Sequence, residues 1–267
     1  MVEMTQSILP GTSTVSVINE QGITVDVMLV EERPLTIFVD KQEVVTLMTM
    51  GSFAELLVIG YLKNQLIFKK LDEIKTVQVD WQTAAVAVVS NQASKDLAVL
   101  KKSRIITTGC GQGTMFGNVM DELKGQVLAK HSLRQSTLYA LLNHLKQHNT
   151  VYKTAGAVHG CALCRGQEIL FFVEDVGRHN AVDTIAGYML LNEIRGDDCI
   201  FYTTGRLTSE MVIKVAQMKI PILLSRSGAT KMGFDIAKQF GVTLISRAKG
   251  KHFQILNGID NVLLDVD

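Results

Sequence analysis

The chain has 267 residues, a formal net charge of +1, 47% hydrophobic residues and 20% charged residues. This balance favours one large or two modest globular domains and excludes a disordered chain or a globally basic nucleic-acid binder. No apolar run is long enough to span a membrane, and the first residues lack the basic and apolar regions of a signal peptide. We therefore expect a cytoplasmic protein that binds neither membrane nor nucleic acid, with its four cysteines reduced.

The first third of the chain is rich in β-branched residues in alternating or continuous apolar runs, which predicts strands. One segment has apolar residues at helical spacing and predicts a buried helix over residues 53–65. The predicted strands are 13–20, 23–32, 35–40, 43–50, 74–80 and 84–89. We interpret residues 1–125 as a β-rich N-terminal subdomain.

The second half alternates strands with amphipathic helices, and residues 118–131 mark the junction because clear periodicity is lost there. Helices are predicted at 132–148, with Ser132 as N-cap, and at 178–194, 209–219 and 231–240. Strands are predicted at 155–164, 168–175, 199–204, 221–225 and 242–246. Residues 126–267 are therefore expected to form an α/β domain with a mixed, mostly parallel sheet covered by helices on both faces.

Cys110 lies in a glycine-rich loop, "TTGCGQGT", directly after a predicted strand. Backbone N–H groups in such a loop can point at one spot, stabilise a thiolate and lower its pKa. The glycines also leave the sulfur open to a bulky partner. A reactive, sulfur-carrying cysteine and a small residue that fills a tight turn are equally favoured by this local pattern.

The stretch "VHGCALC" places Cys161 and Cys164 at C-x-x-C spacing, with His159 close by. This spacing occurs in zinc and dithiol sites, but it supplies only two ligands. Residues three apart in a strand point to opposite faces, so burial in a strand is favoured over metal or redox chemistry.

The stretch "EDVGRHNAVD" ends a predicted strand with two carboxylates and opens a helix with Arg178 and His179. Open α/β sheets bind ligands at the carboxyl ends of their strands. Cations in the first turn oppose the helix dipole and therefore favour a functional role over a merely capped helix start.

The two following strands end in hydroxyl-rich turns that each carry an arginine. Arg206 and Ser209 belong to the first turn, and Arg226 and Ser227 belong to the second. Each turn opens a helix, where anions bind readily, so the repeat indicates an extended anionic ligand along one sheet edge. A basic glycine turn at 247–252 can clamp phosphates or be a solvated turn between two strands.

With these motifs in order, nearly the whole chain resembles the FdhD family of formate dehydrogenase accessory proteins. The resemblance runs from "RPLTIFVDKQEVVTLMTMGSFAELLVIGYL" through "EDVGRHNAVD", "TTGRLTSEMV" and "SRSGATK" to the basic turn. It implies a cytidine deaminase-like fold and a homodimer. It also implies a sulfur carrier, with sulfurtransferase chemistry rather than turnover of a small metabolite.

The resemblance implies that a cysteine desulfurase passes sulfur to Cys110 as a persulfide. The sulfur then reaches the molybdenum bis-molybdopterin guanine dinucleotide cofactor, before that cofactor enters formate dehydrogenase. The residues expected to contact the cofactor are Arg247, Ala248, Lys249, Gly250, Lys251 and His252. Further cofactor or anion contacts are expected from His159, Arg178, His179, Arg206, Ser209, Arg226 and Ser227, and no intrinsic metal is expected.

The chain departs from the family pattern at Gly113, where the loop has a second cysteine in other members. Either Cys110 suffices, or Cys161 or Cys164 serves as an auxiliary thiol. One alternative function is a non-catalytic cofactor-binding chaperone. A zinc-dependent deaminase is less favoured, because Gly160 follows His159 and no proline precedes Cys161, so its H-x-E and P-C-x-x-C motifs are incomplete.

Overall fold

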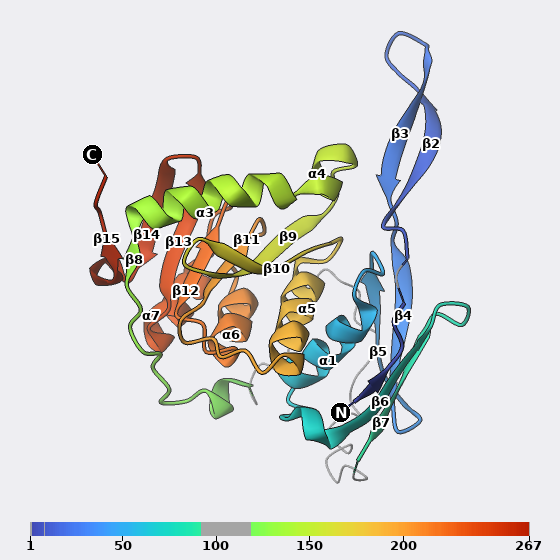
Figure 1. Ribbon diagram of the computed structural model, residues 1–267, viewed down its shortest axis with the longest axis horizontal. Helices are drawn as coiled ribbons and strands as arrows, with labels where there is room; N and C mark the ends of the chain where they lie inside the picture. Colours follow the sequence, from blue (N-terminus) through green and yellow to red (C-terminus); the bar gives the residue numbers. More distant parts are fainter. Residues whose placement is uncertain (1, 8, 92–118, 267) are drawn as a thin grey trace.

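The computed structural model describes residues 2–7, 9–91 and 119–266. Cys110 and Gly113 therefore lie outside the described residues. The described chain forms a five-stranded sheet near the N-terminus and a six-stranded sheet in the second half. Helices lie between the two sheets (Figure 1). The N-terminal β-rich part and the α/β part predicted from the sequence are both present.

The five-stranded sheet has the order β1-β6-β7-β4-β5. Its elements are β1 (Glu3–Met4), β4 (Arg33–Val39), β5 (Gln42–Thr49), β6 (Ile74–Asp80) and β7 (Ala85–Ser90). Leu35, Ile37 and Val39 alternate along β4 and are fully buried. They pack with helix α1 (Ala54–Asn64), and the short 3-10 helix η1 (Leu71–Glu73) leads into β6. Alternation in the strand and helical spacing in α1 thus produce one shared core.

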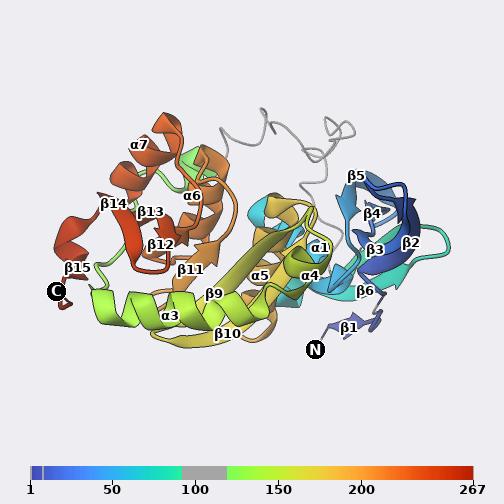
Figure 2. The same ribbon diagram turned by 90° about the horizontal axis from the view of Figure 1, so that it is seen from above.

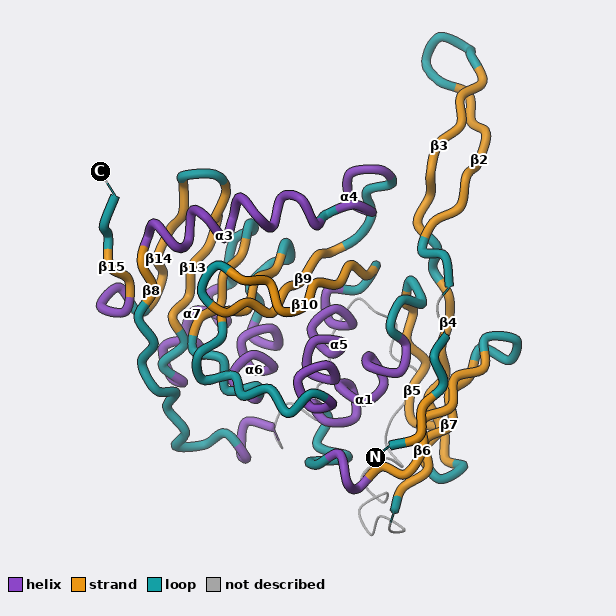
Figure 3. Tube along the Cα trace, viewed as in Figure 1, coloured by secondary structure: helices purple, strands orange, loops and turns teal. Residues whose placement is uncertain are grey.

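Strands β2 (Thr12–Ile18) and β3 (Thr24–Val30) form a separate antiparallel hairpin. The hairpin projects away from both main sheets (Figure 3). Ile18 and Ile23 near its tip are 74% and 55% exposed. The sequence predicted both strands correctly, but it did not separate them from the neighbouring sheet.

The six-stranded sheet has the order β10-β9-β11-β12-β13-β14. Its strands are β9 (His159–Arg165), β10 (Glu168–Asp175), β11 (Ile200–Thr203), β12 (Ile222–Ser225), β13 (Thr243–Lys249) and β14 (His252–Asn257). The three central strands β11, β12 and β13 are parallel, as expected. The outer pairings are antiparallel, because β9–β10 and β13–β14 are hairpins and β9 runs against β11. The sheet is mixed as predicted, but only its centre is parallel.

Helices cover both faces of this sheet, as the sequence predicted (Figure 2). Helix α3 packs on one face and α5, α6 and α7 pack on the other. Their bounds are α3 (Gln135–His148), α5 (Arg178–Leu191), α6 (Ser209–Gln217) and α7 (Lys231–Phe240), and a short α4 (Thr150–Thr154) follows α3. Along β9, Cys161 faces the α5–α7 core and Cys164 faces α3, which is the alternation expected of a strand.

Helices α1 and α5 join the two halves of the molecule through closely approaching backbones. A Cβ atom on Gly60 would lie 1.7 Å from the Asp183 carbonyl oxygen, and one on Gly187 would lie 1.9 Å from the Leu56 carbonyl oxygen. Only glycine fits at these two positions, and the absent side chains let the helices touch.

Two details of the second half differ from, or go beyond, the sequence analysis. Ser132 is not the N-cap of α3, because residues Leu133–Arg134 form strand β8, which pairs with β15 (Val262–Leu263), and the helix begins at Gln135. The 3-10 helix η3 (Ile259–Asn261) precedes β15.

The division of the chain into two parts near residue 125 stays a prediction. No helix within the described ranges is long and apolar enough to cross a membrane.

Candidate functional site

The candidate residues gather at one edge of the six-stranded sheet. Strands β11, β12 and β13 are parallel, so their carboxyl ends meet there. The antiparallel pairings bring the start of β9, the end of β10 and the start of β14 to the same edge. This carboxyl edge therefore collects His159, Arg178, His179, Arg206, Ser209, Arg226, Ser227 and the basic turn 247–252. The sequence analysis expected such an edge from the turns after β11 and β12.

Two hydrogen bonds tie the loop after β11 to the start of β9. The Gly160 N–H donates to Thr204 Oγ1 at 3.0 Å, and the Thr204 N–H donates to the Gly160 carbonyl at 2.9 Å. A Cβ on Gly205 would lie 3.3 Å from Arg178 Cβ and Cδ. The side chain of Arg178 thus packs along this loop, which places two of the predicted motifs in contact.

The loops after β12 and within β13 continue the same chain of contacts. The Arg226 N–H donates to the Thr203 carbonyl at 3.2 Å. The Ser225 hydroxyl donates to the Gly205 carbonyl at 2.6 Å. The Arg247 N–H donates to the Ser227 carbonyl at 2.9 Å. Hydrogen bonds therefore connect four segments, which are the start of β9, the loop after β11, the loop after β12 and the end of β13. They are not independent turns.

The basic turn joins β13 to β14 where the pairing of the two strands is irregular. Arg247 has φ 51° and Gly250 has φ 63°, so the backbone turns through left-handed conformations at both positions. Arg247, Lys249, Lys251 and His252 are exposed. Ala248 is fully buried in the core on the α3 side, so its side chain offers no surface to a ligand.

Asp175, at the end of β10, anchors the loop that carries Arg178. Its carboxylate accepts hydrogen bonds from the Thr49 hydroxyl at 2.5 Å, the Met50 N–H, the Gly177 N–H and the Asn180 side chain. Burial raises the pKa of this carboxyl group, whereas the four donors favour its ionised form. The sequence motif contains Asp175, but its hydrogen bonds with Thr49 and Met50 were not predicted, because these partners come from the other half of the chain.

Beneath the edge, charged side chains of α5 and α6 form a connected set of ion pairs that includes His179. The Nδ1 atom of His179 lies 3.3 Å from Glu210 Oε1, and Lys214 Nζ lies 2.8 Å from Asp183 Oδ2 and 3.5 Å from Glu210 Oε1. Asn64 of α1 donates to Asp183 Oδ1 at 2.7 Å. The ion pair between Lys214 and Glu210 was not predicted, although their i,i+4 spacing on one helix is visible in the sequence.

The positive charge of this edge comes from arginine and lysine, because the half-buried His159 and His179 are held neutral. Burial and then the charge of Lys214 lower the pKa of His179 to about 4. Burial and the charges of Arg178 and Arg206 lower the pKa of His159. Among the described residues, no carboxylate lies within ion-pair distance of Arg206, Arg226, Arg247, Lys249 or Lys251. These cations are available to an anionic ligand.

The helices that open at this edge add donors. The N-cap residues of α5 and α6, Gly177 and Thr208, make no side-chain cap hydrogen bond, whereas Thr230 accepts from the Gly233 N–H at the start of α7. Uncapped N–H groups beside arginines favour anions. The binding of an anion by these turns stays a prediction.

The thiols predicted as auxiliaries are buried. Cys161 and Cys164 are both 0% exposed, and Cys161 contacts the Thr203 hydroxyl at 3.2 Å. Burial raises the pKa of the Cys161 thiol to about 12 and raises that of Cys164 still further from its usual value. Because the thiolate is the nucleophile, this environment argues against either residue as an auxiliary sulfur carrier. Cys199 is also buried, with its pKa raised by burial to about 11.

The deaminase alternative needs three or more ligands around one metal ion. Within the described residues, no group of three or more His, Cys, Asp or Glu side chains is placed to hold one. The opposite orientation of Cys161 and Cys164 explains why this C-x-x-C spacing does not form half of such a site.

The sequence of residues 30–263 matches the model of the FdhD/NarQ family. The chain belongs to this family. A relative in Listeria monocytogenes serotype 4b (strain F2365), named sulfur carrier protein FdhD, is 30% identical over 86% of this chain and 90% of its own length. The protein of that name in Bacillus subtilis (strain 168) is 29% identical over 88% of this chain and 91% of its own.

A solved structure supports the same assignment for the FdhD/NarQ fold. A crystal structure described as that of a formate dehydrogenase accessory protein, from Desulfotalea psychrophila, superposes with a TM-score of 0.75 at 26% identity. The match covers 94% of this chain and 98% of that one. The resemblance found in the sequence is thereby confirmed for the family and the fold.

Proposed function

We propose that this FdhD/NarQ-family protein is a sulfur carrier for formate dehydrogenase. In this proposal Cys110 accepts sulfur from a cysteine desulfurase. The carboxyl edge binds the molybdenum bis-molybdopterin guanine dinucleotide cofactor that receives the sulfur. The cofactor is cargo rather than a resident group. The transfer takes place in the cytoplasm, where thiols stay reduced.

The observation that carries the proposal is the set of cations at the carboxyl edge that have no acidic partner among the described residues. Arg206, Arg226 and Arg247 come from three consecutive strand ends, and backbone hydrogen bonds join their loops. A dinucleotide cargo carries several phosphates, and arginine binds phosphate through two parallel hydrogen bonds. Relatives named sulfur carrier proteins support the chemistry proposed for that cargo.

The proposed loading step conserves electrons. The Cys110 thiolate attacks the outer sulfur of the desulfurase persulfide, the sulfur–sulfur bond of the donor breaks, and the donor cysteine leaves as a thiolate. Delivery of the outer sulfur as sulfide needs two electrons, which we assign to two external thiol groups that end joined to each other as a disulfide. Cys110 then returns to its thiol form, so Gly113 need not be a second cysteine.

The partners of this proposal are a cysteine desulfurase, formate dehydrogenase and a second copy of the chain. The apolar side chains exposed on the β2–β3 hairpin, Ile18 and Ile23 among them, offer one surface for association. Sedimentation analysis of the purified protein tests the homodimer, and Ile18→Ser with Ile23→Ser tests whether the hairpin contributes.

The deciding experiment incubates the protein with a cysteine desulfurase and cysteine and maps added sulfur by peptide mass spectrometry without reductant. Wild type is compared with Cys110→Ala and with the double variant Cys161→Ala, Cys164→Ala. We expect one added sulfur on Cys110, unchanged in the double variant and absent in Cys110→Ala. Activation of formate dehydrogenase is measured in parallel and should fail with Cys110→Ala.

Other results have distinct meanings. Sulfur on Cys161 or Cys164, with less on Cys110 when they are replaced, would establish a relay and contradict the conclusion drawn from their burial. Full activation of formate dehydrogenase by Cys110→Ala, with the desulfurase proven active on another acceptor, would replace the carrier by a cofactor-binding chaperone.

A further inference from the structure

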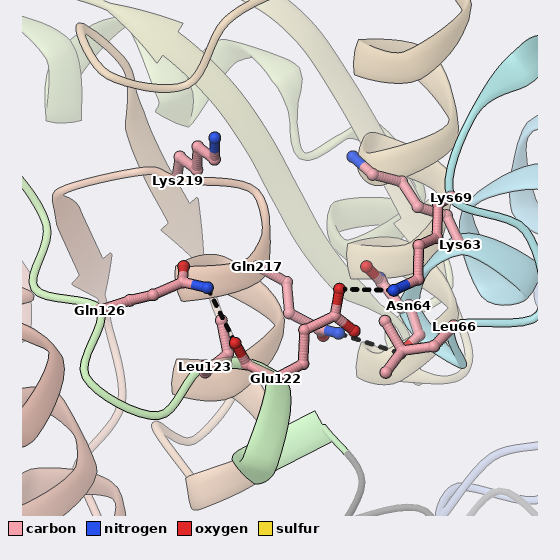
Figure 4. A pocket seen from close by; sticks show the side chains of 9 residues that line it. All are labelled: Lys63, Asn64, Leu66, Lys69, Glu122, Leu123, Gln126, Gln217 and Lys219. Carbon is pink, nitrogen blue, oxygen red and sulfur yellow. Dashed lines mark hydrogen bonds and ion pairs between the residues drawn. The ribbon is translucent and has the colours of Figure 1, made fainter.

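A basic cavity lies at the end of the molecule opposite the carboxyl edge. Helix α6 begins at that edge with Ser209 and ends at Gln217, so the residues after it lie at the other end of the sheet. Helix α1 likewise begins beside Met50, which contacts Asp175 at the edge, and ends at Asn64. A pocket of about 160 Å³ opens between these two helix ends and residues 122–126 (Figure 4).

Nine residues line this distal pocket, and three of them are lysines. The lining residues are Lys63, Asn64, Leu66, Lys69, Glu122, Leu123, Gln126, Gln217 and Lys219. Lys69 pairs with Glu122 at 3.1 Å, and both side chains are largely in solvent, so this pair contributes little. No acidic side chain in the described parts of the chain lies within ion-pair distance of Lys63 or Lys219. The lining therefore carries a net charge of about +2 when its lysines are protonated.

The two unpaired lysines act on each other. Burial and the charge of Lys219 lower the pKa of Lys63. Two like charges that face one cavity oppose each other, and an anion bound between them would relieve that repulsion.

Capping of the helix ends does not account for these lysines. Lysine side chains near a helix C-terminus often bind its last carbonyls. Here the carbonyls of residues 61–63 of α1 accept backbone N–H groups, and that of Asn64 accepts the Gln217 side chain at 3.2 Å. The carbonyls of residues 214–216 of α6 also accept backbone N–H groups. The carbonyls of residues 61–64 and 214–216 therefore do not need the ammonium groups of Lys63 and Lys219 as hydrogen-bond donors.

Neutral groups complete a small polar site. Gln126 and Gln217 each use one side-chain N–H, to the Glu122 and Asn64 carbonyls, and each amide nitrogen carries a second hydrogen. Leu66 and Leu123 add an apolar wall. The cavity has room for roughly ten water molecules, which suits a ligand well below the size of a dinucleotide.

We propose that the distal pocket binds a small phosphoryl anion, such as a diphosphate or a short organic phosphate, between Lys63 and Lys219. The two ammonium groups contact the oxyanion, the amides of Gln126 and Gln217 donate to its remaining oxygens, and the leucines pack against any attached carbon. The lysine ammonium groups would bind the phosphoryl oxygens as point charges. This site is independent of the proposed sulfur transfer.

The test is a titration of the full chain with inorganic pyrophosphate, at constant ionic strength, followed by amide NMR spectra and by calorimetry. We expect signals of residues 63–66, 122–126 and 217–219 to shift. The dissociation constant should rise about tenfold or more in Lys63→Gln and in Lys219→Gln, because each loses a hydrogen bond to a charged ligand. The charge-retaining variant Lys63→Arg should bind within a few-fold of wild type.

Matched controls separate this site from the carboxyl edge. Lys238→Gln removes an exposed lysine of α7 and should bind pyrophosphate as wild type does. The edge variant Arg226→Gln should leave the shifts at the distal pocket intact. Sulfate, titrated at the same ionic strength, should bind more weakly, since it lacks the higher charge of pyrophosphate.

Three results would overturn the proposal. They are no shifts at the distal pocket, shifts confined to the loops after β11, β12 and β13, or equal loss of binding in Lys238→Gln and Lys63→Gln. Shifts confined to the edge would leave the sulfur-carrier proposal untouched. Failure of persulfide formation on Cys110 would leave the distal pocket untouched.

Discussion

The second half of the molecule holds two sets of charged side chains that differ in burial and in pairing. Asp183 and Lys214 are buried and paired at 2.8 Å. The cations of the carboxyl edge, such as Arg206 and Lys249, are exposed and have no acidic partner among the described residues. Buried charge needs a partner for the protein to fold, whereas unpaired charge at a surface is tolerated and is available for binding.

The difference indicates that the charged groups beneath the edge stabilise the fold, whereas the cations of the edge are available for the proposed cargo. Substitutions beneath the edge should therefore act mainly on stability, and substitutions at the edge should act mainly on binding. The four predictions below test that separation, from the largest expected change to the smallest.

The largest effect is expected where α1 and α5 touch. In Gly60→Ala, the new methyl group would lie 1.7 Å from the Asp183 carbonyl, so the helices must separate. We expect the free energy of unfolding to fall by about 4 kcal/mol or more. Gly228→Ala is the matched control, because the nearest atom to its Cβ is 3.9 Å away, and it should cost less than about 1 kcal/mol. Urea denaturation measures both, and equal losses would refute the close contact.

The buried pair should give the next largest loss. Asp183→Ala leaves the Lys214 ammonium buried with Glu210 alone at 3.5 Å, and it removes the acceptor of Asn64. Removal of one partner of a buried pair costs about 3–5 kcal/mol of unfolding free energy. Adding Lys214→Met should recover part of this loss in the same denaturation experiment. A double variant no more stable than Asp183→Ala would contradict the view that the unpaired ammonium is the cause.

These two predictions concern features that the sequence revealed only in part. Alternation and helical spacing located the strands and helices of both halves, because local pattern reflects which face is buried. The buried helix at 53–65 was predicted, but its contact with α5 was not, since Gly60 and Gly187 are more than a hundred residues apart. Local spacing carries no information on which two helices meet.

The candidate site shows the same limit. Strand-end motifs predicted the residues of the carboxyl edge, because parallel strands end on one side of a sheet. The bond between the Thr49 hydroxyl and Asp175 was invisible, since it joins the two halves of the chain. Ala248 was expected to contact the cofactor by its place in the basic turn, yet the irregular pairing of β13 with β14 leaves it in the core.

The third prediction concerns His179, which lies between the two charge sets. Its pKa is lowered to about 4 by burial and by Lys214, against 6.5 in an unfolded chain. Between these values the unfolded state binds more protons, so stability is fully present above pH 6.5 and falls as the pH drops toward 4. The loss is at most about 3 kcal/mol for such a shift.

The measurement is urea denaturation of wild type and His179→Gln at several pH values from 7 to 4. His159 contributes in the same direction in both proteins, so the difference between the two curves isolates His179. We expect the variant to lose less stability on acidification. Parallel curves would show that the pKa of His179 is not lowered by folding. His179 would then belong with the exposed cations of the edge and not with the buried charges beneath it.

The smallest effect on stability, and the sharpest test of the comparison, is expected at the edge. Lys249→Ala and Arg206→Ala remove exposed cations that have no acidic partner, so the free energy of unfolding should change by no more than about 0.5 kcal/mol. Binding of the molybdenum bis-molybdopterin guanine dinucleotide cofactor should weaken about tenfold in each, since a hydrogen bond to a charged phosphate is lost.

Arg195→Ala is the control, because Arg195 is also exposed but pairs with Asp197 away from the edge, and cofactor binding should not change. A large loss of stability in the edge variants would show that these cations stabilise the fold, as the buried charges do. An equal loss of binding in Arg195→Ala would show that net charge, and not the geometry of the four connected loops, attracts the cofactor.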